Sequence, residues 1–239
     1  MPSAAADFGV RGLPPCVTID LVSRLDFYVS PAGPRAVILL LHGGQQHSAE
    51  PVKNRHASWW RMAALARSLR RYAEQHDLAL SLLQYGQRGW NDLSAPSPVK
   101  DARAAIDELA DRWPGVPIVL VGHSMGGRTA CRVADEPSVI GVVGLAPWLP
   151  EGEQNSSIEG RHLRVIHGTQ DAWTSAALSR KYVERSQTTA ASATWTSLRG
   201  GGHFMFRHSA TWKRFVTDSV TDIFGVGSSQ RRAAREDRI

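Results

Sequence analysis

The segment from Pro117 to Glu136 constrains the fold of this chain more than any other. It begins with an apolar run, Pro117 to Val121, that predicts a buried strand. The run ends at Gly122-His123-Ser124-Met125-Gly126, and the residues from Arg128 to Glu136 favour a helix. A serine on so tight a turn needs glycines two positions away on either side, because the flanking backbones come close together. We therefore expect Ser124 to be presented beside a helix N-terminus, where negative charge is favoured.

This strand, turn and helix resemble the nucleophile elbow of the α/β-hydrolase family, whose signature is G-x-S-x-G. The resemblance extends over most of the chain, roughly residues 17–224. It implies an α/β fold in which a mostly parallel central sheet carries helices on both faces. It specifies the substrate much less closely, because this fold hosts esterases, lipases, thioesterases, peptidases and amidases.

The hydrophobic pattern of the remaining chain predicts the same architecture. Apolar runs alternate with amphipathic segments, which is typical of a parallel sheet covered on both sides. The expected strands are 17–21, 25–29, 36–41, 78–83, 117–121, 139–145, 163–167 and 193–198, and the expected helices are 58–75, 98–113, 128–136, 175–185 and 211–224. Residues 146–161 leave no room for the lid domain that many family members insert there, so we expect no large lid.

The sequence predicts one domain with two extensions. Residues 1–16 form a lead-in, residues 17–224 a single α/β-hydrolase domain, and residues 225–239 a basic tail that we expect to be disordered. The first residues show no basic and apolar pattern of a secretion signal, and no apolar run approaches the roughly 20 residues that span a membrane. Only two cysteines occur, Cys16 and Cys131, so we expect no disulfide framework and a cytoplasmic monomer or homodimer.

The formal net charge of +6 raises the question of a nucleic-acid partner. The densest basic cluster lies in the tail, at Arg231, Arg232, Arg235 and Arg238. Elsewhere the arginines are scattered over helix faces, where solvation is the simplest interpretation; they include Arg61, Arg67, Arg70, Arg71, Arg103, Arg112, Arg180 and Arg185. No nucleic-acid motif accompanies the charge, so we expect neither a nucleic-acid nor a membrane partner.

A serine becomes a useful nucleophile only when a base removes its proton and a third group orients that base. The family resemblance implies the chain order serine, acid, histidine, with each residue on a loop after a strand. Asp171 fits the acid, because it ends His167-Gly-Thr-Gln-Asp just after an apolar strand. A capping aspartate is the alternative. Asp92 and Asp135 fit less well, because one precedes Ser124 and the other lies late in the elbow helix.

His203 is the expected general base. It follows the triple glycine Gly200 to Gly202, after the last strand and before the final helix, which is where the family resemblance implies the base. His208 is the fallback, although it lies closer to the start of that helix. The remaining histidines show no H-x-x-H or H-E-x-x-H spacing, so we expect no metal site and no cofactor.

Acyl transfer also requires donors for the tetrahedral oxyanion. The backbone N–H of Met125 is one expected donor, because it follows the nucleophile. The turn His42-Gly43-Gly44 resembles the family's H-G-x turn after the first buried strand, and the second donor is assigned to the N–H of Gly44, with Gln45 as the alternative. We expect His42 itself to brace the turn.

Aromatic residues are expected at the mouth of the site. Trp90, Trp148 and Trp173 each follow an expected strand at the same edge of the sheet, and Phe204 and Met205 flank His203. Rigid aromatics there would favour an apolar acyl or alcohol group. Packing in the core or rim is the alternative for each tryptophan.

The sequence therefore predicts a serine hydrolase that cleaves small, fairly apolar carboxylic esters through an acyl-enzyme on Ser124. The same triad could act instead on a thioester, or on an amide in a peptide or natural product. A binding protein without activity could also share this fold, although it would be expected to carry a damaged triad, and here every member is present.

Overall fold

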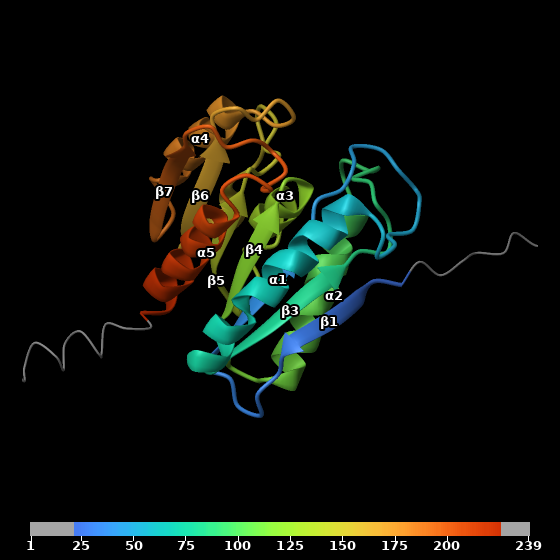
Figure 1. The fold of residues 1–239 in the computed structure, drawn as a ribbon, viewed down its shortest axis with the longest axis vertical. Coiled ribbons are helices and arrows are strands. Elements are labelled where there is room, and N and C mark those ends of the chain that lie inside the picture. The colour runs from blue at the N-terminus through green and yellow to red at the C-terminus, as the bar shows by residue number, and fades with distance from the viewer. Residues whose placement is uncertain (1–21, 226–239) are drawn as a thin grey trace, which may run out of the picture.

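The computed structural model describes residues 22–225, and Figure 1 shows a central twisted sheet with helices in front of it and behind it. The described strands are β1 (Arg24–Val29), β2 (Ala36–Leu41), β3 (Leu78–Gln84), β4 (Ile118–His123), β5 (Val139–Leu145), β6 (His162–Gly168) and β7 (Ser192–Leu198). The described helices are α1 (Ala57–Gln75), α2 (Ser97–Arg112), α3 (Met125–Arg132), α4 (Ala176–Ser186) and α5 (Ser209–Phe224), with a 3₁₀ turn η1 (Ser156–Ile158).

The strands form one sheet in the order β1-β3-β2-β4-β5-β6-β7. β1 pairs with β3 in the antiparallel direction, and every other described pairing is parallel. All residues of β2 and β4 are buried, as expected for central strands covered on both faces. The carboxyl ends of the parallel strands meet at one edge, and the loops that follow them converge there.

Helices α1 and α5 lie side by side in front of the sheet (Figure 1), where the Tyr72 hydroxyl donates to the Thr217 carbonyl at 3.2 Å. Helices α2 and α3 pack against each other behind the sheet. The apolar stripe expected for α1 faces the core, since Met62, Ala66 and Leu69 are fully buried. The α/β-hydrolase fold predicted from the sequence is therefore confirmed.

Most predicted elements agree with the structure to within one or two residues, but the elbow helix does not. It was expected over residues 128–136, whereas α3 begins at Met125 and ends at Arg132. It begins early because its first turn packs tightly on β2: a Cβ on Gly126 would lie 2.2 Å from the Leu41 carbonyl oxygen. It cannot extend through Glu136, because Pro137 disfavours helical geometry at the preceding residue.

The connection from β5 to β6 contains only η1 within residues 146–161, so no lid domain is inserted there. In the part of the chain that the structure describes, no helix is long and apolar enough to cross a membrane. Cys131 is a buried free thiol. The predictions for strand 17–21, Cys16, the lead-in and the basic tail fall outside the described residues, apart from Gly225 at the start of that tail.

Candidate active site

Ser124 occupies the turn between β4 and α3 with a positive φ of 55° and a ψ of −118°. That conformation is strained for a residue with a side chain. The turn is held by backbone hydrogen bonds, in which the Ser124 N–H donates to Leu145 at 3.1 Å and the Ser124 carbonyl accepts from Trp148 at 2.9 Å. A Cβ on Gly122 would lie 2.2 Å from the Gly126 carbonyl oxygen, so the expected glycine requirement has a direct steric basis.

The three residues expected to form a triad lie in hydrogen-bonding contact. His203 Nε2 is 3.1 Å from Ser124 Oγ, and His203 Nδ1 is 2.8 Å from Asp171 Oδ2. His203 is 7% exposed, and the Asp171 side chain has no exposed surface. This geometry lets the imidazole accept the serine proton while the carboxylate fixes its tautomer and stabilises the imidazolium that forms.

Asp171 is held by four further donors. Its Oδ1 accepts from the N–H groups of Trp173 and Thr174, and its Oδ2 accepts from the Thr174 hydroxyl at 2.8 Å. His167 Nε2 lies 3.2 Å from the same Oδ2. Burial alone would raise the pKa of Asp171, but the hydrogen bonds from His167, His203 and the two amides outweigh it and lower that pKa. Asp171 therefore stays ionised.

Sequence reasoning assigned no role to Thr174 or His167. A further chain of hydrogen bonds runs behind the acid, from Trp195 Nε1 to Ser179 Oγ at 3.1 Å and from Ser179 Oγ to His167 Nδ1 at 2.8 Å. This chain fixes the ring of His167 beside Asp171. The motif H-G-x-x-D contains the signal, because its histidine lies near the end of β6 and four residues before the acid that it contacts.

The alternative residues lie elsewhere. Asp92 accepts hydrogen bonds from Ser94 in a surface turn, and Asp135 pairs with Arg103. His208 is the N-cap residue of α5. The alternative role for Asp171, helix capping, is performed by Ser175, whose hydroxyl accepts from Leu178 at the start of α4.

Met125 and Gly44 both line the cavity around Ser124. In the part of the chain that the structure describes, neither N–H has a hydrogen-bond acceptor. The N–H of Gln45, the alternative donor, is already bonded to the Arg88 carbonyl at 2.8 Å. Gly44 has no room for a side chain, because a Cβ there would lie 2.3 Å from the Arg88 carbonyl oxygen. The pair Met125 and Gly44 can therefore hold an oxyanion.

Two buried histidines support the loops of the site. His42 bonds through Nδ1 to the Gly43 carbonyl at 2.6 Å and accepts from the Tyr85 N–H through Nε2 at 3.3 Å, so it braces the H-G-x turn. His123 donates through Nε2 to the His203 carbonyl at 2.8 Å. Burial lowers the pKa of His42 to about 4, and burial together with the nearby His203 lowers that of His123 to about 3. Both are neutral.

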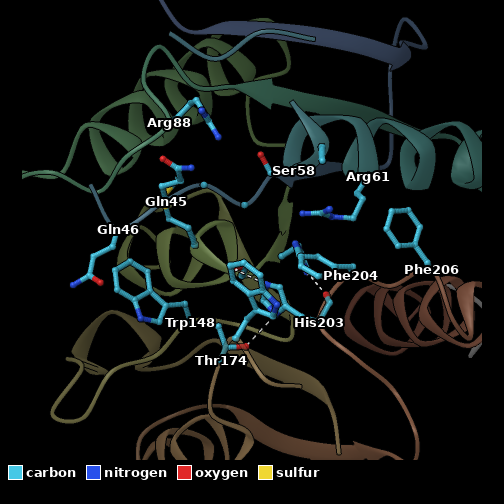
Figure 2. Close-up of a pocket in the computed structure, with 17 residues that line it drawn as sticks. Gln45, Gln46, Ser58, Arg61, Arg88, Trp148, Thr174, His203, Phe204 and Phe206 are labelled. Atoms are coloured by element: carbon cyan, nitrogen blue, oxygen red, sulfur yellow. Dashed lines mark hydrogen bonds between the residues drawn. The ribbon is translucent and has the colours of Figure 1, made fainter. Parts of the chain in front are cut away.

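A cavity of about 640 Å³ opens above Ser124, and Figure 2 shows the side chains around it. Trp148, Trp173 and Phe204 line it, as expected. Trp173 is 71% exposed and stacks on the His203 ring, with centroids 6.3 Å apart and an interplanar angle of 21°. Phe204 meets Trp173 edge to face at 5.3 Å. In the described part of the chain, no cluster of side chains is suited to a metal ion.

The expectation that Trp90 lies on the rim is wrong. Its side chain is 1% exposed and does not line the cavity. The Arg128 guanidinium lies 4.1 Å from the Trp90 ring centroid and 4.6 Å from that of Trp148, and it pairs with buried Glu153 at 2.6 Å. Trp90 therefore packs in the core, where it contacts the Arg128 guanidinium and the edge-to-face ring of Trp148.

Arg61 was grouped with the solvated arginines, but it lines the cavity. It lies on α1 three residues after Ser58, which also lines the cavity, and four residues before buried Leu65. That helical spacing places Arg61 at the edge of the buried face. This spacing can be read from the sequence, and it was the signal that could have placed Arg61 next to the cavity.

Comparisons with known proteins agree with this architecture. The model of the alpha/beta hydrolase family matches residues 38–174. Protein phosphatase methylesterase 1 of Bos taurus is 35% identical over 112 residues, which make up 46% of this chain and 26% of that protein; the Homo sapiens protein is 34% identical over the same shares. The chain thus spans about a quarter of the length of the curated relatives it matches.

Solved structures show the same fold at low identity. Est1E from Butyrivibrio proteoclasticus superimposes with a TM-score of 0.61 at 13% identity, over 85% of this chain and 94% of that one. A serine hydrolase without a lid from Xanthomonas campestris superimposes with a TM-score of 0.59 at 17% identity, over 84% and 88% of the two chains.

Proposed function

Because the chain belongs to the α/β-hydrolase family, we propose that it is a serine hydrolase that cleaves small carboxylic esters through an acyl-enzyme on Ser124. The observation that carries the proposal is a pair of contacts made by His203: its Nε2 lies 3.1 Å from Ser124 Oγ, and its Nδ1 lies 2.8 Å from Asp171 Oδ2. We also expect the protein to act without a cofactor, in the cytoplasm, as a monomer or homodimer.

In the proposed mechanism, His203 removes the proton of Ser124 as the hydroxyl attacks the acyl carbonyl. The N–H groups of Met125 and Gly44 stabilise the oxyanion of the tetrahedral intermediate. His203 then protonates the leaving alcohol and later activates the water that releases the acid. Asp171, kept ionised by its hydrogen bonds, stabilises the imidazolium in both steps.

The proposal names an ester because the curated relative is a methylesterase by name. Trp148, Trp173 and Phe204 supply apolar surface for the acyl or alcohol group. A thioester or an amide would use the same three residues, so a panel of the three substrate types separates these activities. A non-catalytic binding protein has less support, because the hydrogen bonds that activate a serine are all present.

The test is covalent labelling of the purified protein with a fluorophosphonate, followed by mass spectrometry of the labelled peptide. The variant Ser124→Ala removes the nucleophile, and Ser197→Ala is the matched control, because Ser197 is exposed on β7 and outside the cavity. We expect Ser124 to be labelled in the parent and in Ser197→Ala, with turnover of 4-nitrophenyl esters of short acids. Ser124→Ala should reduce kcat by at least about 1,000-fold.

An unlabelled Ser124 together with no ester turnover would show that the serine is not activated. The binding-protein interpretation would then replace the hydrolase.

A further inference from the structure

Arg61 lines the cavity and has no charged partner among the residues that the structure describes. Its guanidinium extends from α1 into the cavity (Figure 2) and lies 4.8 Å from the Phe204 ring centroid and 5.9 Å from that of Phe206. Its Nε is buried without a hydrogen-bond partner, and the side chain forms no ion pair with any residue from 22 to 225. Burial lowers the pKa of Arg61, yet an arginine remains charged at neutral pH.

The rest of the described cavity lining carries no formal negative charge. No aspartate or glutamate is among the described residues that line it. Arg88 lines it as well, but its charge is matched by an ion pair with Glu50. The carboxylate of Asp171 is fully covered behind His203. The positive end of the long helix α1 contributes further, because Ala57 and Ser58 of its first turn line the cavity.

A half-buried charge without a partner costs free energy in the unoccupied protein, and an anion of matching shape offsets that cost. The planar guanidinium fits a carboxylate through two parallel hydrogen bonds. We propose that Arg61 binds a carboxylate carried by the substrate, so that the preferred ester is anionic with an apolar body. This inference rests on the proposed hydrolase function. Among the described residues that line the cavity, Arg61 is the one arginine or lysine without an ion pair, and its single positive charge matches a carboxylate better than it matches a phosphate dianion.

Packing alone could also explain Arg61, since its guanidinium stacks on Phe204 and Phe206. The variant Arg61→Met separates the two roles, because methionine keeps an unbranched apolar side chain and removes the charge. Arg61→Lys keeps the charge and removes the planar fork. Arg71→Met is the matched control, because Arg71 is exposed on the same helix and does not line the cavity.

The experiment compares two pairs of esters that differ in one charge. The 4-nitrophenyl monoester of adipic acid and 4-nitrophenyl hexanoate differ only at the end of the acyl chain. The pair 4-acetoxybenzoate and 4-acetoxybenzamide differs only in the leaving alcohol. For each pair, the readout is the ratio of kcat/KM for the anionic ester to kcat/KM for the neutral ester.

We expect the ratio to exceed one in the parent for at least one pair. It should fall on the order of 10- to 100-fold in Arg61→Met, because charge-assisted hydrogen bonds contribute that much to binding. It should fall less in Arg61→Lys and stay at the parent value in Arg71→Met. Ratios that are equal in the parent and in Arg61→Met for both pairs would overturn the carboxylate site.

Turnover of the neutral esters tests the hydrolase separately. Neutral esters hydrolysed at an unchanged ratio would refute only the role of Arg61. No hydrolysis of any of the four esters, with Ser124 unlabelled by the fluorophosphonate, would refute the proposed function itself.

Discussion

Replacement of Gly44 by alanine tests the oxyanion site through the backbone alone. The added Cβ would lie 2.3 Å from the Arg88 carbonyl oxygen and 2.4 Å from Met125 Cε. The methionine end can move aside, but the carbonyl belongs to the backbone that accepts the Gln45 N–H at 2.8 Å. Ordinary contacts begin at 3.4 Å, so the turn carrying Gly44 must shift by about 1 Å.

A shift of that size moves the Gly44 N–H out of hydrogen-bonding range of the developing oxyanion. Loss of one oxyanion donor lowers kcat by about 100- to 1,000-fold, which corresponds to about 2.7 to 4 kcal/mol of transition-state stabilisation. The KM should change little, because the donor acts on charge that is absent from the ground state. We therefore expect Gly44→Ala to fold, to bind ester and to turn it over slowly.

The assay measures kcat and KM on a 4-nitrophenyl ester together with the thermal midpoint of unfolding. Gly202→Ala is the matched control: it makes the same chemical change in another loop of the site, where the nearest atom to the new Cβ is the Gln170 carbonyl oxygen at 3.9 Å. A folded Gly44→Ala with kcat within about threefold of the parent would refute the reasoning, because a 1 Å shift of a required donor costs about 100-fold.

Two further predictions concern stability. Glu153→Gln should lower the free energy of unfolding, measured in urea, by about 3 to 5 kcal/mol, because Arg128 would keep its buried charge without the partner that lies 2.6 Å away. The control Glu184→Gln breaks only an exposed pair with Arg180 and should lower it by less than about 1 kcal/mol. Equal losses in the two variants would contradict the argument. The folded pKa values of His42 and His123, about 4 and about 3, lie below the ordinary 6.5, so the unfolded chain binds protons that the folded chain excludes. The contribution of the two histidines to the free energy of unfolding should be fully present above pH 6.5 and should fall toward pH 5 by up to about 1.4 kcal/mol per pH unit for each histidine. Urea titrations at pH 7 and pH 5 should show a smaller loss of stability in His42→Asn than in the parent. An identical loss would mean that His42 does not contribute.

The fold and the three reacting residues could be predicted from the sequence, because each depends on the geometry of a short segment of the chain. The strained turn at Ser124 needs Gly122 and Gly126, whose Cβ positions are filled by backbone atoms. Buried strands such as β2 and β4 appear as unbroken apolar runs. The extent of α3 depends instead on its contact with β2, a part of the chain distant in sequence, so α3 begins at Met125 and not at the expected Arg128.

Trp90 and Arg61 show why the walls of the cavity were harder to predict. For each of them the local sequence is compatible with two positions. An aromatic residue after a strand can face the cavity or the core, and an arginine at the edge of the apolar face of a helix can face solvent or a cavity. Trp90 packs in the core against Arg128 and Trp148, which lie far along the chain. The Arg61 guanidinium contacts Phe204 and Phe206, which belong to the loop after β7 and lie far from α1 in the sequence.

The same distinction separates chemistry from specificity in this protein. The Ser124, Asp171 and His203 contacts are set by the loops that follow β4, β6 and β7 at one edge of the sheet, so a sequence that builds these loops also builds the contacts. The charge and shape of the cavity depend also on side chains from α1 and from the loop after β7, which are far apart in the sequence. A change at Arg61 can therefore alter which ester is accepted and leave the hydrogen bonds of the three residues in place, because Arg61 bonds to none of them.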